Sequence, residues 1–227
     1  MKPYYQQDGQ TVYHGDCREI LPQLTEKFDL CLTDPPYGHG DKWAGGTWAS
    51  NPIYDAAFVW DAARMTQLDI DTVLRHAVNV IVWGGNYYQF TPSRCWLIWE
   101  KSSKMATLAD VEMAWTNFDR PAKMFREDRN PDGKREHPTQ KPTSLLKWCL
   151  GFAPGSILDP FMGSGTTLVA AKQLGRRATG IEIEEKYCEI AIKRLSQQEI
   201  EWPQDIRQQK VGPQLGQDTE LGLFRTR

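Results

Sequence analysis

Apolar residues recur along the chain in two alternating patterns, which predict strands and helices in turn. Short apolar runs of strand length occupy residues 11–16, 28–34, 79–85, 94–101, 110–117, 156–161 and 176–183. Apolar residues at helical spacing occupy 17–26, 69–78, 142–153, 163–175 and 184–200, with Asp69 as the expected cap of the second. Strands that alternate with helices predict an α/β fold with a mainly parallel sheet covered on both faces.

Three segments lack either periodicity and are therefore expected to be irregular. Residues 38–66 contain Gly, Trp and Asn without a clear period, which predicts a long loop with at most a helical turn. Residues 120–136 are polar and charged, and NPDG within them indicates a turn. After Trp202 the sequence becomes Gln-rich, so we expect one domain over residues 1–202 and a poorly ordered tail over 203–227.

Composition narrows the classes of function. A net charge of −2 provides no global basic field, so any contact with nucleic acid has to come from a local patch. The five cysteines occur singly, without the spacing of a zinc site or a disulfide framework, and we expect no metal. The first ten residues lack the apolar core of a signal peptide, and no apolar run approaches the roughly 20 residues of a membrane span. The sequence therefore predicts a soluble cytoplasmic protein.

A glycine turn follows the predicted strand at 156–161. In ILDPFMGSGTT, Gly163 and Gly165 allow close approach of a ligand to the backbone, and the first helical turn offers free N–H groups to an anion. Glu182, at the tip of the next strand, is placed where a ribose hydroxyl pair is bound in nucleotide sites. The pattern predicts a nucleoside-bearing cofactor with a carboxylate end. The alternative for Glu182 is a solvated acid at a strand end.

A second candidate site is LTDPPYGHG, residues 32–40. Two successive prolines end the preceding strand and present a carboxylate beside an aromatic ring. Asp34 and the Pro35 carbonyl are two hydrogen-bond acceptors presented side by side, which can stabilise positive charge that develops on a ligand. Tyr37 offers an aromatic face beside them. The alternative is a rigid turn without chemistry.

Three motifs in this order resemble the beta-type amino-methyltransferases, which methylate exocyclic amines of DNA bases with S-adenosylmethionine. DPPY is similar to the catalytic motif, DPFMGSGTT to the cofactor loop, and HPTQKP to the element that precedes that loop. The resemblance extends from about Tyr13 to about Leu195. It implies a Rossmann-like, circularly permuted fold with a seven-stranded sheet, double-stranded DNA as substrate and S-adenosylhomocysteine as product. It also implies dimers, since beta-type relatives often dimerise.

The resemblance assigns roles residue by residue. The catalytic candidates are Asp34, Pro35, Pro36 and Tyr37. Asp34 and the Pro35 carbonyl are expected to accept the two N–H bonds of the exocyclic amine, and Tyr37 to stack on a base turned out of the duplex. The cofactor-binding candidates are Asp16, Cys17, Asp34, Thr139, Lys141, Asp159, Phe161, Gly163, Ser164, Gly165, Thr166 and Glu182. Thr139 and Lys141 are implied to lie near the methionine carboxylate, and Asp16 near the adenine; a surface turn and a plain helix cap are the respective alternatives. Asn86 and Tyr87 are candidates for the base pocket.

The first residue of the catalytic motif bears on the target base. Asp34 favours adenine N6, because Asp is more usual for adenine and Ser for cytosine within the family. Cytosine N4 remains an alternative, as do an RNA or protein methyltransferase and a catalytically silent DNA-binding regulator.

The target-recognition region is small compared with that of the family. It is reduced to about 118–136, and 38–66 is expected to form an active-site loop, so we predict a short or relaxed recognition sequence. Candidate DNA contacts are Lys42, Trp43, Arg120, Lys123, Arg126, Arg129, Lys134 and Arg135. Residues 220–224, ELGLF, loosely resemble peptides that bind the replication sliding clamp; a disordered tail is the alternative.

Overall fold

A computed structural model describes residues 1–38, 64–103, 109–129, 131 and 140–197. The chain divides into two units, Met1–Ser196 and Gln197–Arg227. The second unit lies outside the described residues except for its first residue, so the fold below is that of the first unit. Within the described residues, no helix is both long and apolar enough to cross a membrane.

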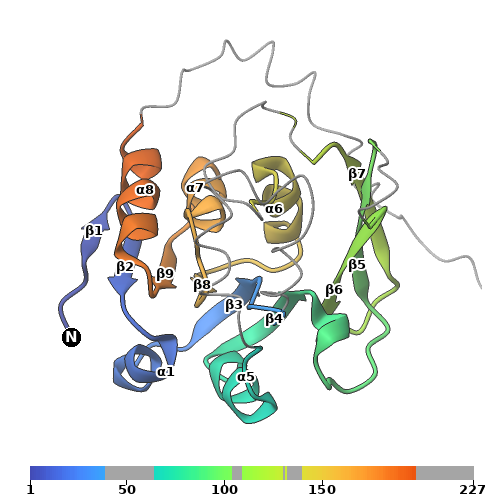
Figure 1. Ribbon diagram of the computed structural model, residues 1–227, viewed down its shortest axis with the longest axis horizontal. Coiled ribbons are helices and arrows are strands. Elements are labelled where there is room, and N and C mark those ends of the chain that lie inside the picture. Colours follow the sequence, from blue (N-terminus) through green and yellow to red (C-terminus); the bar gives the residue numbers. More distant parts are fainter. Residues whose placement is uncertain (39–63, 104–108, 130, 132–139, 198–227) are drawn as a thin grey trace, which may run out of the picture. The chain divides into compact units, whose positions relative to one another are not determined.

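A mixed sheet of nine strands forms the centre of the first unit (Figure 1). In spatial order the strands are β1 (Tyr5–Gln7), β2 (Gln10–His14), β9 (Ala178–Glu182), β8 (Ile157–Asp159), β3 (Phe28–Thr33), β4 (Ala77–Trp83), β6 (Val111–Thr116), β5 (Trp96–Lys101) and β7 (Lys123–Glu127). The stretch from β2 to β4 is parallel throughout. The predicted α/β class and Rossmann-like sheet are confirmed, but the count of seven strands is wrong for the described residues. The edge strands β1 and β7 were not predicted.

Helices cover both faces of the sheet (Figure 1). One face carries α6 (Thr143–Leu150), α7 (Thr166–Gln173) and α8 (Glu185–Ser196); the other carries α1 (Cys17–Ile20), the short 3-10 turn η1 (Leu21–Gln23) and α5 (Gln67–Leu74). Successive side chains of a central strand point to opposite faces of the sheet, so each strand contributes to the hydrophobic core on both faces. In β3, Leu30 and Leu32 pack with the first group, whereas Cys31 packs with the second. Burial on both faces explains why these strands read as continuous apolar runs.

The start of α5 differs from the sequence prediction. Asp69 was expected to be the cap, but the cap is Thr66, whose hydroxyl oxygen accepts a bond of 3.2 Å from the Asp69 N–H. The Thr66 hydroxyl in turn donates to Asp69 Oδ2 at 2.7 Å. Asp69 therefore lies in the first turn, where a carboxylate also favours the helix dipole.

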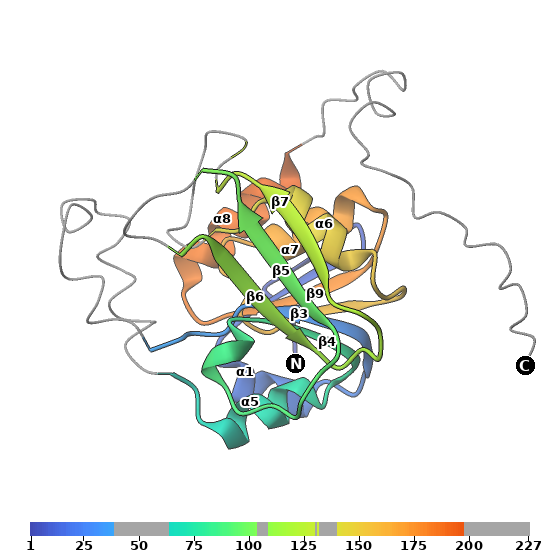
Figure 2. The same cartoon turned by 90° about the vertical axis from the view of Figure 1, so that its right-hand side faces the viewer.

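The segment 120–136, predicted to be irregular, contains strand β7 (Figure 2). β7 pairs in parallel with β5 at the edge of the sheet. Phe125 packs against the core, with its ring tilted against that of Trp148 and the centroids 5.3 Å apart, whereas Lys123 and Met124 are exposed. Only one apolar side chain of KMFRE points inward, so the alternation was too weak to be recognised. Its charged side chains also suit an edge strand that must not pair further.

The strand order brings distant motifs together. β8, which ends at the DPF of the glycine turn, pairs with β3, which ends just before Asp34. Their carboxyl ends therefore lie at the same edge of the sheet, where ligands of open α/β sheets bind. A hydrogen bond of 2.9 Å from the Thr33 hydroxyl to Asp159 Oδ1 joins residues 126 apart in sequence.

Candidate active site

A cavity of about 470 Å³ opens at the carboxyl ends of the parallel strands. Its walls come from the turn after β2, the end of β3, the start of α5, the segment at 140–141, the glycine turn after β8 and the end of β9. Both predicted motifs, DPPY and GSGTT, contribute to the same walls. One ligand seated here can therefore contact the glycine turn and Asp34 together.

The glycine turn is built around two residues in the left-handed region. Gly163 has φ +51° and Gly165 has φ +77°, and α7 begins directly after them. A Cβ on Gly165 would lie 2.6 Å from Ala191 Cβ, so packing of α8 also requires glycine there. Arg194 of α8 donates to the Ser164 carbonyl at 2.6 Å and to Thr166 Oγ1 at 2.9 Å. Arg194 was not predicted to belong to the site, although a cation in the last turn of a helix is a recognised signal.

Glu182 is held in place by backbone donors. The Gly163 N–H donates to Oε2 at 2.9 Å and the Glu184 N–H donates to Oε1 at 2.9 Å. Burial raises the pKa of this carboxyl, and the two backbone bonds partly offset that rise. Each carboxylate oxygen retains a lone pair, and the residue lines the cavity. Glu182 is therefore oriented as an acceptor on the cavity wall; its binding of a ribose hydroxyl pair stays a prediction.

Asp159 is a buried carboxyl that joins the two motifs. Besides the bond from Thr33, its Oδ1 accepts from the Phe161 N–H at 3.2 Å. Burial raises its pKa to about 6, against the lowering effect of these donors and of Thr167. Its position indicates that it fixes the glycine turn to the end of β3 while lining the cavity wall.

Asp16 and Cys17 lie at the start of α1, on the cavity wall. Asp16 is the helix cap and accepts from the Arg18 N–H at 2.8 Å and from the Arg18 guanidinium at 2.5 Å, which lowers the pKa of its carboxyl. Arg18 also lies 3.9 Å from Asp69 of α5. Burial raises the pKa of the Cys17 thiol to about 12, so it is an uncharged wall residue and not a nucleophile. Both predicted positions reach the cavity, and Arg18 was missed.

Asp34 follows β3 and binds two donors. Tyr37 Oη donates to Asp34 Oδ1, and Lys141 Nζ donates to Asp34 Oδ2. A quarter of the Asp34 side chain remains exposed, whereas Lys141 is 7% exposed. Burial raises the pKa of Asp34, and the Lys141 ammonium is the main opposing influence. Lys141 was predicted near the cofactor carboxylate; the structure places it against the catalytic candidate itself.

Tyr37 lies in an aromatic stack at the end of β4. Its ring stacks on Tyr87 with centroids 4.7 Å apart and an interplanar angle of 29°. Beneath the ring is Gly84, φ +64°, where an added Cβ would overlap the tyrosine. Tyr88 Oη donates to the Pro36 carbonyl at 2.6 Å and so anchors the turn from the other side. Tyr87 was among the residues predicted for the base pocket, whereas Tyr88 and Gly84 were not.

Comparison with known proteins agrees with this arrangement. A family model described as DNA methylase, for N6 and N4 methyltransferases, matches residues 57–193. Type II methyltransferase M2.DpnII of Streptococcus pneumoniae is 52% identical, over 86% of this chain and 92% of the relative. The chain belongs to the N6/N4 DNA methylase family. Type II methyltransferase M.ScaI of Streptomyces caespitosus is 26% identical, over 86% of this chain and 84% of the relative.

Solved structures show the same fold. A cytosine-N4-specific PvuII DNA methyltransferase aligns with a TM-score of 0.61 and 18% identity, over 88% of the present methylase and 90% of that chain. A complex of M1.HpyAVI with S-adenosylmethionine aligns with a TM-score of 0.54 and 23% identity, over 83% and 100% respectively. The resemblance inferred from the three motifs is thus confirmed at the level of family and fold.

The methylase gathers most of the predicted cofactor residues around one cavity. Those that line it are Asp16, Cys17, Asp34, Lys141, Asp159, Phe161, Gly163, Ser164, Thr166 and Glu182. Gly165 lies immediately behind, at the start of α7. Thr139 lies outside the described residues. Their roles stay predictions, because proximity to a cavity does not identify a ligand.

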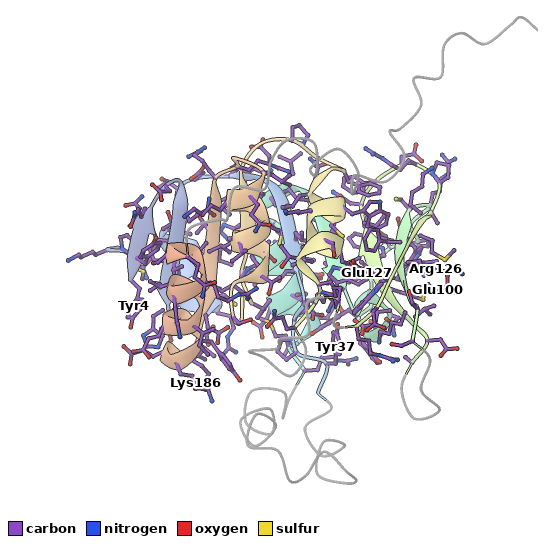
Figure 3. All side chains as sticks on the ribbon, turned by 90° about the horizontal axis from the view of Figure 1, so that it is seen from above. Tyr4, Tyr37, Glu100, Arg126, Glu127 and Lys186 are labelled. Carbon is purple, nitrogen blue, oxygen red and sulfur yellow. The ribbon has the colours of Figure 1, made fainter. Side chains whose placement is uncertain are left out.

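Some of the side chains predicted to contact DNA are bound to other parts of the protein, and others are exposed. Arg126 forms a two-pronged pair with Glu100, with bonds of 2.8 and 2.9 Å, and Figure 3 shows the two side chains together, away from Tyr37. Arg129 donates to the carbonyls of Ser103 and Ala109 at 2.7 and 2.9 Å, a structural contact. Arg120 lies 4.8 Å over the Phe118 ring, and Lys123 is exposed. Lys42, Trp43, Lys134, Arg135 and the clamp-like peptide at 220–224 lie outside the described residues.

Proposed function

We propose that this DNA methylase transfers a methyl group from S-adenosylmethionine to the N6 amine of adenine in double-stranded DNA. The observation that carries the proposal is the convergence of Asp34 with Glu182 and the glycine turn on one cavity. Membership of the family supplies the DNA substrate class, and Asp34 as the first residue of DPPY favours adenine over cytosine.

The residues around the cavity fit S-adenosylmethionine. Glu182 is oriented by Gly163 and Glu184 and offers carboxylate oxygens to a ribose hydroxyl pair. Apolar side chains of Phe161 and Ile181 line the same wall and suit an adenine ring. When bound, this cofactor supplies a methyl group already activated on a sulfonium, so the protein has no covalent intermediate to form.

Asp34 would act on the amine of the target base. The lone pair of an adenine amine is delocalised into the ring, so the nitrogen is a poor nucleophile. A carboxylate that accepts one of its N–H bonds favours localisation of the lone pair and stabilises the positive charge that develops. Tyr37 occupies Asp34 Oδ1 in the present structure. Since each carboxylate oxygen can accept a second hydrogen bond, an amine N–H can bind Asp34 beside the bond from Tyr37.

Aromatic stacking would hold the base. Tyr37 and Tyr87 form a stacked pair beside Asp34, and Tyr87 is 37% exposed. Stacking on such rings contributes roughly 1–3 kcal/mol per base and tolerates any base. The acceptor at Asp34, and not the stack, is thus the part of the site that distinguishes the amine.

The test is transfer of labelled methyl groups to unmethylated DNA, with RNA and protein as competing acceptors. We expect label in DNA, and digestion of that DNA to nucleosides should yield N6-methyladenine. Label recovered as N4-methylcytosine would contradict the base assignment while leaving the class of reaction intact. Label only in RNA or protein would contradict the substrate.

Substitution Asp34→Ala tests the division of roles. It should abolish transfer, a loss of at least about a thousand-fold, because the amine loses its acceptor. Cofactor binding measured by calorimetry should change by less than about three-fold, since Glu182 and the glycine turn are untouched. Gly163→Val should abolish cofactor binding, and transfer with it, because a branched side chain is strained at φ +51°. Equal loss of cofactor affinity in both variants would refute this division.

A further inference from the structure

The β5–β6 hairpin carries two opposite charges that belong to none of the recognised motifs. Lys101 ends β5 and Glu112 lies near the start of β6. Lys101 Nζ lies 2.6 Å from Glu112 Oε1; the lysine side chain is 7% exposed and the glutamate 33%. Lys101 Nζ also lies 5.2 Å over the ring of Trp99. The Lys101 ammonium is therefore buried, where a charge requires a specific partner, and Glu112 is that partner.

The same glutamate reaches the catalytic candidate through Lys141. Glu112 Oε2 lies 3.5 Å from Lys141 Nζ, and Lys141 Nζ donates to Asp34 Oδ2. The four side chains form a row of alternating charge, Lys101, Glu112, Lys141, Asp34, with a formal sum of zero. The ring of Trp83, 5.3 Å from Lys141 Nζ, covers the ammonium. A surface hairpin is thus coupled to the turn that carries Asp34.

The sharing of Lys141 between two carboxylates has a chemical consequence. An ammonium paired with Asp34 alone would neutralise the acceptor that the amine has to use. An ammonium that is absent would leave a buried carboxyl prone to keep its proton. Glu112 also binds the Lys141 ammonium, so Lys141 shares its charge between two carboxylates. The ammonium is then close enough to keep Asp34 ionised without neutralising it fully. Lys101 balances the charge of Glu112.

We propose that Glu112 is a positioning residue of the methyl transfer, which sets the charge state of Asp34 through Lys141. The inference rests on the function proposed for Asp34. Glu112 is not among the residues that line the cavity; it directs the Lys141 ammonium, which contacts Asp34. Lys101 holds Glu112 in this orientation.

The groups around the row fix the direction of the expected effect. Asp34 is faced by Tyr37 of its own turn, Lys141, Glu112 of β6 and Asp159 of β8; Lys141 is faced by Asp34, Glu112 and Cys149 of α6. Burial is the largest influence on the pKa of Asp34 and raises it, Lys141 lowers it, and Glu112 raises it. Removal of the Glu112 charge should therefore shift ionisation of Asp34 to lower pH. Removal of the Lys141 charge should shift it to higher pH.

The experiment is the pH dependence of kcat at saturating cofactor and DNA, from about pH 5 to about pH 9. The acid limb is the fall of kcat at low pH, where Asp34 becomes protonated. In Glu112→Gln this limb should shift to lower pH by roughly half a pH unit or more, and in Lys141→Gln it should shift to higher pH by a similar amount. The KM for S-adenosylmethionine in Glu112→Gln should stay within about three-fold of wild type. A structural role alone would lower activity at every pH without moving the limb.

Matched variants keep the test decisive. Glu100→Gln removes a neighbouring acid of the same hairpin, paired with Arg126 away from the row, and should leave the limb unmoved. If Glu112→Gln fails to unfold cooperatively because Lys101 loses its partner, the double variant Lys101→Gln, Glu112→Gln removes both charges and is scored in the same way. An unmoved limb in the folded variant overturns the proposal. A wild-type protein without transfer to DNA would instead refute the proposed function.

Discussion

Gly84 illustrates, at the scale of single residues, how backbone freedom serves the site. It directly follows β4, has a left-handed backbone conformation with φ +64°, and lies beneath the ring of Tyr37. Two requirements coincide here: a conformation that other residues adopt at a cost of roughly 1–2 kcal/mol, and empty space under an aromatic ring. The position of the tyrosine therefore depends on a residue that has no side chain.

Substitution Gly84→Ala should lower kcat by at least about ten-fold, because the new methyl group displaces Tyr37 from Asp34. The matched control is Gly175→Ala, at φ +66°, where an added Cβ meets nothing within 4 Å. Gly175→Ala should lose about 1–2 kcal/mol in urea unfolding, and Gly84→Ala should lose more, because its Cβ also overlaps the Tyr37 ring. Wild-type kcat in Gly84→Ala, alongside the expected loss of stability, would show that the tyrosine need not be held there.

Asp159 gives a prediction on pH. Burial raises its pKa from the ordinary 3.8 to about 6, so the folded protein keeps this proton where the unfolded chain releases it. Its contribution to stability is therefore most favourable at low pH and is lost as pH rises from about 4 to about 6. Asp159→Asn keeps an oxygen that can accept the Thr33 hydrogen bond, but its side chain does not titrate.

The stability of Asp159→Asn relative to wild type should therefore increase between these pH values, by on the order of 2 kcal/mol, and be constant above. Urea unfolding at a series of pH values measures it. A difference between the two proteins that does not vary with pH would mean that Asp159 titrates normally in the folded state.

At the scale of elements, α8 supports the cofactor turn from behind. Ala191 packs on Gly165, and Arg194 ties the Ser164 carbonyl to Thr166. A guanidinium with several directed donors suits this task better than a point charge. The helix is thus part of the site, although none of its residues from Ala191 onward line the cavity.

Arg194→Met should weaken cofactor binding by about ten-fold, since the Ser164 carbonyl and Thr166 hydroxyl lose their donor and the turn loosens. Lys193→Met, which removes an exposed cation from the same turn of α8, is the control and should bind normally. Calorimetric titration with S-adenosylmethionine compares the two. Equal affinities in both variants would contradict a supporting role for Arg194.

At the scale of the whole molecule, the segment 118–136 bears on how DNA is read. The segment expected to serve recognition is partly used by β7 for the sheet, and Arg129 is bound to loop carbonyls. This use of the segment supports the prediction of a short or relaxed recognition sequence. The measurement is sequencing of the methylated sites on plasmid DNA. A single strict target of six or more base pairs would contradict the prediction.

Lys123 on β7 is exposed and is the simplest phosphate contact to test. Lys123→Gln should weaken DNA binding several-fold across all sequences and reduce the slope of log K against log salt by about 1. Lys2→Gln, an exposed lysine near the opposite edge strand β1, should change neither quantity. An identical salt slope in wild type and Lys123→Gln would remove this residue from the DNA surface.

The sequence by itself determined the class of fold, the central strands and the two motifs, because these depend on local chemistry. Continuous apolar runs indicate strands buried on both faces, and prolines and glycines end them at fixed residues. It did not reveal β7, whose pattern is weak, or the Thr66 cap. It also could not reveal Gly84, Tyr88 or Arg194 as supports of the site.

Only the tertiary structure decided which distant residues meet. Pairing of β3 with β8 places Asp34 beside the glycine turn, and pairing of β6 with β4 places Glu112 beside Lys141. Local sequence cannot specify such meetings, because strand order is set by the packing of whole helices and strands. The carboxylate of DPPY was visible in the sequence; the row of charges behind it required the folded chain.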